Sequence, residues 1–164
     1  MTRKVGGAHL GGTDLHVITV SPVLTVHATY AANDYVGTST DPMDFEGVVD
    51  KNGGSGFILG ATLIDYALQS VAGELWLFDT TVVPPADSAA WTITDAESAT
   101  LIGVIPFSTY YASAVNSVSN GTPANPLPFK CGSAVNDIYG CFVTRGAPAY
   151  ASLDLTFRLY TVEA

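Results

Sequence analysis

Apolar and polar residues alternate with the two-residue period of β-strands along most of this chain. The segment 153–159 alternates strictly, so its odd-numbered residues are expected to point inward. Two other segments, 57–66 and 74–79, are apolar at almost every position, which is typical of strands covered on both faces by another layer or by a partner chain. Strands are expected at 15–20, 23–28, 35–36, 45–49, 57–66, 74–79, 101–107, 138–145 and 153–159.

Turn-forming residues separate these segments. The glycine-rich cluster 52–56 and the proline pair in 83–85 interrupt the chain, and 108–128 is expected to be a long connection rich in Ser, Asn, Pro and Gly. One short helical turn is expected at 94–97, because Thr94 is a capping residue and acidic residues follow it.

Closely spaced strands leave no room for helical crossovers between parallel strands. The sequence therefore predicts an all-β fold, a single β-sandwich or jelly-roll domain over 13–164 with at most one short helix. Residues 1–12 contain four glycines and show no apolar period, so they are expected to form a flexible N-terminal arm.

The composition is poor in charge. The chain has 164 residues, of which 48% are hydrophobic and 13% charged, and its mean hydropathy is +0.30. Surplus apolar surface on such a chain indicates an interface with a partner, although a very well-filled core would also account for it. The net charge of −9, with only six scattered basic residues, argues against a nucleic-acid partner.

No segment predicts a membrane or secretory role. No run reaches the ~18 apolar residues of a membrane helix. The basic start at Arg3 and Lys4 is not followed by the apolar stretch of a signal peptide, so synthesis in a cytoplasm is expected.

No pattern predicts catalysis, a metal or a cofactor. The histidines His9, His16 and His27 are scattered, and the serine of 53–56 lacks the second glycine of a nucleophile elbow. The same cluster lacks the Gly-Lys-Ser/Thr ending of a phosphate loop, and five acids between 34 and 50 match no calcium-loop spacing. A hydrolase with a split site is the least favoured alternative, and the protein is not expected to be an enzyme.

The two cysteines, Cys131 and Cys141, have no nearby histidine with which to form a zinc site. Buried free thiols are favoured, and a disulfide is geometrically possible if the two residues lie on adjacent strands.

Six stretches follow one another in a fixed order, at 30–37, 53–56, 75–79, 93–96, 127–130 and 139–150. In this order and spacing they resemble the head decoration (cement) proteins of tailed bacteriophages. Residues 30–37, Tyr-Ala-Ala-Asn-Asp-Tyr-Val-Gly, are similar to a Tyr-Ala-x-Gly-Asp-x-Val-Gly stretch of that family, with Asn33 standing where glycine is usual. The resemblance covers roughly residues 25–160 and does not include the arm.

This resemblance implies a non-enzymatic jelly-roll protein on the outer surface of the virion, made in the bacterial host cytoplasm. Its partners would be the major capsid protein and further copies of itself, often as a homotrimer that clamps neighbouring capsomers. Under this hypothesis the subunit interface includes Phe57, Leu59, Trp76 and Phe78. The capsid contact includes the arm residues Arg3, Lys4 and His9.

The alternative is a tail- or fibre-associated carbohydrate-binding module. Such a module needs an exposed aromatic platform on which sugars stack, and Trp91, Tyr110 and Tyr111 are the candidates. Trp91 is expected to be exposed, whereas Trp76 lies in an apolar run and is expected in the core.

Overall fold

The computed structural model describes residues 14–24, 28–38 and 41–164, and it consists of antiparallel strands with one short helix. A six-stranded sheet contains β1 (Leu15–Val20), β13 (Leu155–Glu163), β5 (Ser55–Asp65), β9 (Ser117–Gly121), β8 (Tyr110–Ala112) and β10 (Leu127–Lys130). A five-stranded sheet contains β3 (Tyr35–Val36), β4 (Met43–Phe45), β11 (Ile138–Thr144), β6 (Gly73–Phe78) and β7 (Leu101–Phe107). The short strands β2 (Ala28–Thr29) and β12 (Ala149–Tyr150) pair with each other.

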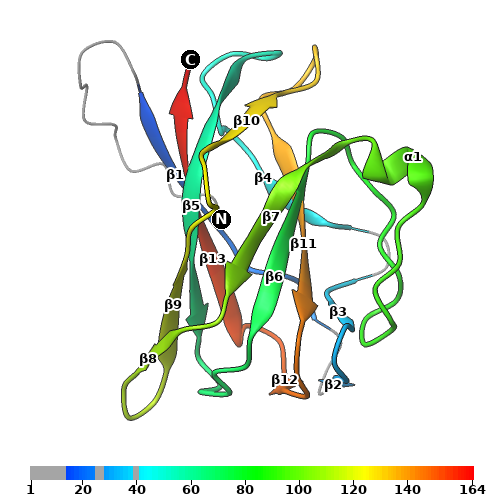
Figure 1. The fold of residues 1–164 in the computed structure, drawn as a ribbon, viewed down its shortest axis with the longest axis vertical. Helices are drawn as coiled ribbons and strands as arrows, with labels where there is room; N and C mark the ends of the chain where they lie inside the picture. Colours follow the sequence, from blue (N-terminus) through cyan, green and yellow to red (C-terminus); the bar gives the residue numbers. More distant parts are fainter. Residues whose placement is uncertain (1–13, 25–27, 39–40) are drawn as a thin grey trace.

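The two sheets pack face to face as a β-sandwich with jelly-roll connectivity (Figure 1). One sheet has the order β1-β13-β5-β9, and the other has β11 between β6 and the pair β3 and β4, with β7 at its edge. The first described strand thus lies beside the last, and the chain crosses between the sheets after β1, β4, β5, β7, β10 and β11. This is the double Greek key of a jelly roll, and the predicted all-β sandwich is confirmed.

The core between the sheets is aromatic and aliphatic. Phe157 from β13 packs against Phe142 of β11 and Phe107 of β7, with ring centroids 5.1 and 6.0 Å away, so three phenylalanines join the two sheets. The alternation predicted for the last strand is confirmed at positions 155, 157 and 159, which are all buried. It is wrong at Leu153, which is 73% exposed and has a φ of 70° in the turn before β13.

Other predicted boundaries also need correction. The segment 108–128 is not one long connection, because it contains β8, β9 and the start of β10. The strand expected at 45–49 ends at Phe45, since the chain turns at once with Gly47 at a φ of 75°. Of the strand expected at 23–28, residues 25–27 lie outside the described chain and β2 begins only at Ala28.

The predicted helical turn is confirmed as α1 (Asp95–Ser98). Thr94 accepts a hydrogen bond from the Glu97 N–H, and the Glu97 carboxylate accepts one from the Thr94 N–H, which completes a capping box. Among the residues described, no helix has the length and apolar character needed to cross a membrane.

Candidate interaction surface

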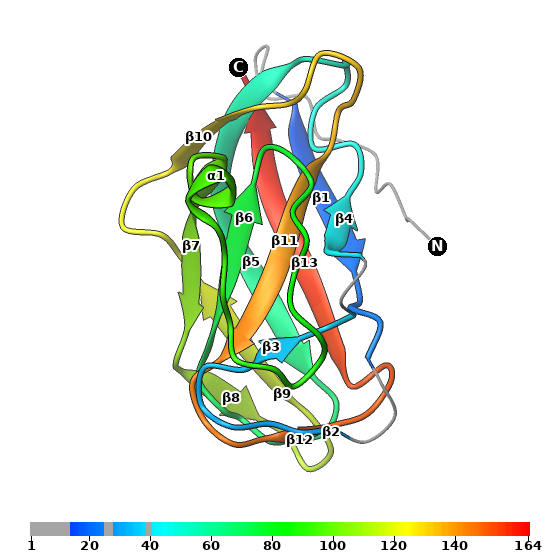
Figure 2. The ribbon, with the colours of Figure 1, turned by 90° about the vertical axis from the view of Figure 1, so that its right-hand side faces the viewer.

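The outer face of the five-stranded sheet is covered by the chain itself. The segment 79–93 lies over it, as Figure 2 shows, and Trp91 packs there against Trp76 and Tyr35 with ring centroids 5.7 and 5.8 Å away. The cover is held by hydrogen bonds from the Tyr30 hydroxyl (2.8 Å) and the Gly37 N–H (3.2 Å) to the Asp87 carboxylate. These contacts form a second small core on this side of the sandwich.

The outer face of the six-stranded sheet carries exposed apolar side chains instead. The strand register aligns one row across four strands: Leu15 of β1 opposite Val162 of β13, then Phe57 of β5, then Pro128 of β10. Phe57 is 42% exposed, and Leu59, which points the same way two residues on, is 38% exposed. We call the outward side chains of this sheet the open face.

Two further rows complete the open face. A polar row runs through Arg158, Thr62 and Asn120, where the Thr62 hydroxyl donates to the Asn120 side chain at 2.9 Å. A second apolar row crosses β8, β9 and β5, and its members are Tyr111, Val118 and Ile64. Apolar rows on both sides of a hydrogen-bonded polar row, with a single guanidinium among them, suit contact with another protein surface of low charge.

The four residues predicted for the subunit interface do not share one surface. Phe57 and Leu59 lie on the open face, but Trp76 and Phe78 belong to β6 of the opposite sheet. Trp76 is half-buried beneath Trp91, and Phe78 is 0% exposed. The apolar character of β6 is explained by the chain's own cover rather than by a second subunit.

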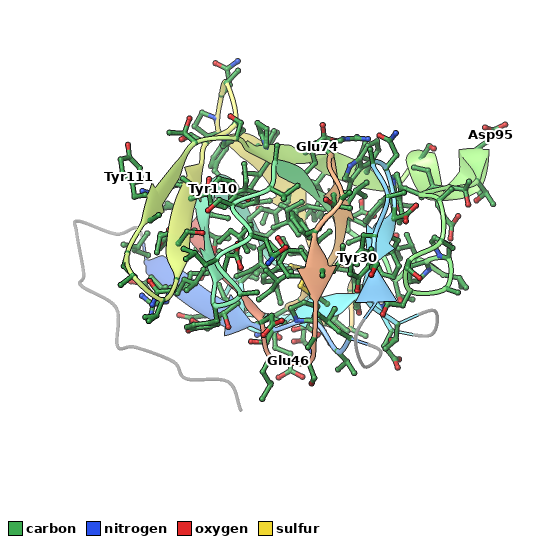
Figure 3. All side chains as sticks on the ribbon, turned by 90° about the horizontal axis from the view of Figure 1, so that it is seen from below. Tyr30, Glu46, Glu74, Asp95, Tyr110 and Tyr111 are labelled. Atoms are coloured by element: carbon green, nitrogen blue, oxygen red, sulfur yellow. The ribbon has the colours of Figure 1, made fainter. Side chains whose placement is uncertain are left out.

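The three residues predicted for a sugar platform are not brought together either. Trp91 is half-buried in the cover of the five-stranded sheet, so its expected exposure is wrong. Tyr110 and Tyr111 lie on β8, at the side of the molecule away from α1 (Figure 3). The Tyr110 hydroxyl donates to the Val71 carbonyl at 2.6 Å, and of the three only Tyr111 is largely exposed, at 68%.

The predicted capsid-contact residues Arg3, Lys4 and His9 lie outside the described residues. Three residues of the first apolar row, Leu15, Val162 and Pro128, were not predicted as site residues. Their signal is weak because each is one apolar position in its own segment, and only the strand pairing places them side by side.

An acidic cleft of about 480 Å³ lies between the end of β1 and the β3–β4 region, and Asp41, Asp44 and Glu46 line it. Burial, together with the nearby Asp137 and Glu46 charges, raises the pKa of Asp44 to about 6. Glu46 is labelled in Figure 3 at this side of the sandwich. The cleft therefore presents negative charge that partly opposes folding.

Away from this cleft, the buried carboxylate of Asp65 has backbone hydrogen-bond partners. Asp65, which is fully buried, accepts hydrogen bonds from the N–H groups of Ala67 (3.0 Å) and Ser70 (2.7 Å) and so orders the turn after β5.

Cys131 is buried in the main core and Cys141 in the second core, and both are free thiols, as favoured from the sequence. A group of possible metal ligands consists of His16, Asp50 and Glu163.

The chain was compared with protein families, with curated proteins and with solved structures, and none of the three comparisons gives a match.

Proposed function

We propose that this protein is a non-enzymatic virion structural protein that coats the outside of a tailed-phage head and associates with copies of itself through the open face. The observation that carries this proposal is the apolar row of Leu15, Val162, Phe57 and Pro128 on a sheet face with no cover from the described chain. Jelly-roll connectivity supports it, since this fold is common among viral capsid proteins. The sequence resemblance to head decoration proteins points to the same role.

The open face suits contact between subunits better than contact with solvent. Sheets that pack face to face bury aligned rows of side chains, and the open face carries two aligned apolar rows. Arg158 brings one positive charge into a polar row whose other members are neutral, so two copies would meet with little repulsion. The resemblance implies a trimer, and closed symmetric assemblies are the usual outcome for identical chains.

Attachment to the head would then depend on many weak contacts. A coat protein that repeats over a lattice gains avidity from each additional bound copy, so no single contact has to be strong. Rigid antiparallel strands and a filled core serve this role without an active site.

The proposal is tested by co-sedimentation of the purified protein with phage heads assembled without it. Saturable binding at a fixed ratio to the major capsid protein supports it, and the same assay on a chain lacking residues 1–12 measures what Arg3, Lys4 and His9 contribute. Binding that never saturates, or no binding, rejects the capsid role.

The carbohydrate-binding alternative has less structural support. Its proposed platform is divided between β8 and the segment that covers the five-stranded sheet, and Trp91 is packed against Trp76 and Tyr35 rather than presented to a ligand. Glycan-array binding that is lost when Tyr111 is substituted, together with no binding to phage heads, would favour this alternative.

A further inference from the structure

A histidine and two carboxylates meet at the end of the sandwich that carries the C-terminus (Figure 1). His16 comes from the start of β1 and Glu163 from the last position of β13, and Asp50 comes from the loop between β4 and β5. One ligand atom from each residue lies within 4.8 Å of those from the other two.

The strand register explains why these residues converge. His16 is paired with Thr161 in the β1–β13 ladder, so its side chain points to the inner side of the sheet, as does that of Glu163 two residues further on. The Thr161 hydroxyl donates to the Val48 carbonyl at 2.7 Å, and the Asp50 N–H donates to the Glu163 carboxylate at 3.1 Å. The loop is thereby held against the two strands.

The imidazole of His16 is the unusual member of this group. His16 is only 7% exposed, and its Nε2 atom has no hydrogen-bond partner among the residues that the structure describes. Oε2 of Glu163 lies 3.8 Å from this nitrogen, which is beyond hydrogen-bond distance. A buried polar atom without a partner costs free energy. A nitrogen that faces a carboxylate at this distance therefore indicates a ligand that binds to both groups.

A metal ion accounts for the gap. Ions bound to imidazole nitrogen and carboxylate oxygen at about 2.0–2.2 Å hold their ligand atoms roughly 3–4.4 Å apart, so this group needs only a small contraction. A ligand set of one imidazole nitrogen and two carboxylate oxygens suits Zn²⁺ and the neighbouring first-row transition metals, whereas Ca²⁺ and Mg²⁺ prefer oxygen ligands alone.

We propose that His16, Asp50 and Glu163 bind one divalent transition-metal ion, for which Zn²⁺ is the best fit. The ion would link both strands at the sandwich end to the β4–β5 loop. Because Leu15 and Val162 adjoin two of the ligands in sequence, the bound ion would also hold this end of the open face in place.

The test is calorimetric titration of ZnCl₂ into the full chain, prepared without a histidine tag and treated with a chelator beforehand. One ion per chain is expected. Glu163→Gln and Asp50→Asn should each weaken binding by at least about tenfold, since loss of even outer partners of a metal has effects of that size. Asp95→Asn, which removes a carboxylate from the remote helix α1, should bind as the unmodified chain does.

Histidine-labelled protein provides a second readout in the same titration. Zn²⁺ should shift the imidazole resonances of one histidine out of three, identified as His16 by their absence in His16→Gln. If that variant does not fold, the thermal shift given by Zn²⁺ to the unmodified chain and lost in Glu163→Gln serves instead. Absence of saturable binding, shifts at His9 or His27 alone, or undiminished binding by Glu163→Gln would each overturn the proposal.

Discussion

Phe57 offers the sharpest test of the open face, because Phe157 on the neighbouring strand is its buried counterpart. Both are phenylalanines of the six-stranded sheet, but Phe57 points outward and is 42% exposed, while Phe157 points inward and is 0% exposed. Truncation of each to alanine therefore separates self-association from folding. We expect Phe57→Ala to weaken association with a modest loss of stability, and Phe157→Ala to destabilise the fold.

The expected size follows from the exposed area. A phenylalanine buries about 200 Å² when fully covered, so 42% exposure leaves roughly 80 Å² for a partner. Full burial of a phenylalanine side chain contributes about 1.5–3 kcal/mol, so covering this exposed fraction contributes about 0.6–1.3 kcal/mol, or a change of about 3- to 9-fold in the dissociation constant. Within the subunit, the covered part of the Phe57 side chain stabilises the fold by about 1–1.5 kcal/mol.

Removal of Phe157 creates a cavity among three packed rings and should cost about 3–5 kcal/mol. For a domain of this size the melting temperature should fall by about 6–20 °C, compared with about 2–6 °C for Phe57→Ala. Phe157→Ala chains that remain folded should associate normally, since their open face is intact.

Sedimentation equilibrium over a concentration series measures the association constant, and thermal melts at low concentration measure the stability of the fold. Val83→Ala, which truncates an exposed residue of the cover on the opposite sheet, is the matched control and should change neither. The reasoning is refuted if Phe57→Ala associates as strongly as the unmodified chain, or if the unmodified chain stays monomeric at its solubility limit.

Three further predictions concern folding and reactivity. Thr94→Ala removes the helix cap and should cost about 1 kcal/mol, or about 2–4 °C in melting temperature, whereas Thr92→Ala nearby should cost less than about 0.5 kcal/mol; equal losses would show that the cap contributes nothing. The folded pKa of Asp44, about 6, exceeds its ordinary 3.8, so its charge opposes folding above pH 6 and ceases to do so as the pH falls below 3.8. Asp44→Asn should accordingly raise the free energy of unfolding near pH 8 by at most about 1 kcal/mol, after allowance for solvent screening, and have no effect near pH 3.5; a pH-independent gain would contradict this cause. Burial raises the pKa of Cys131 to about 11 and that of Cys141 to about 12, so both thiols should react with a disulfide reagent only when urea unfolds the chain, and rapid labelling of the folded protein would contradict their burial.

The sequence predicted the elements whose pattern is local. Strands with strict alternation or long apolar runs were found, and so was the helix, because Thr94 and Glu97 form its cap within four residues. The turn at Asn33 also has a local cause, because its φ of 75° is a conformation that asparagine tolerates better than most residues with a side chain.

The sequence failed where long-range pairing decides the structure. Strand β9 is a run of Ser, Val, Asn and Gly that carries turn-forming residues, and it is a strand because β5 and β8 pair with its two edges. Ser117 and Ser119 are fully buried there, which no propensity scale would suggest. The assignment of Phe57 and Phe78 to one predicted interface failed for the same reason, since both lie in apolar runs and only the fold of 79–93 determines which outer face is covered.

The unequal covering of the two sheets has a consequence for assembly. Ordering the cover of the five-stranded sheet costs conformational entropy for each of its residues, and the Trp91 stack and the Asp87 hydrogen bonds offset that cost. A subunit that was apolar on both outer faces could add copies on either side and grow into open stacks. With one face covered, the proposed association through the other face would end in a small closed oligomer. Such an oligomer would leave the covered sheet and the ends of the sandwich outside the interface between its subunits. Under the proposed function, these surfaces would be available for contact with the capsid.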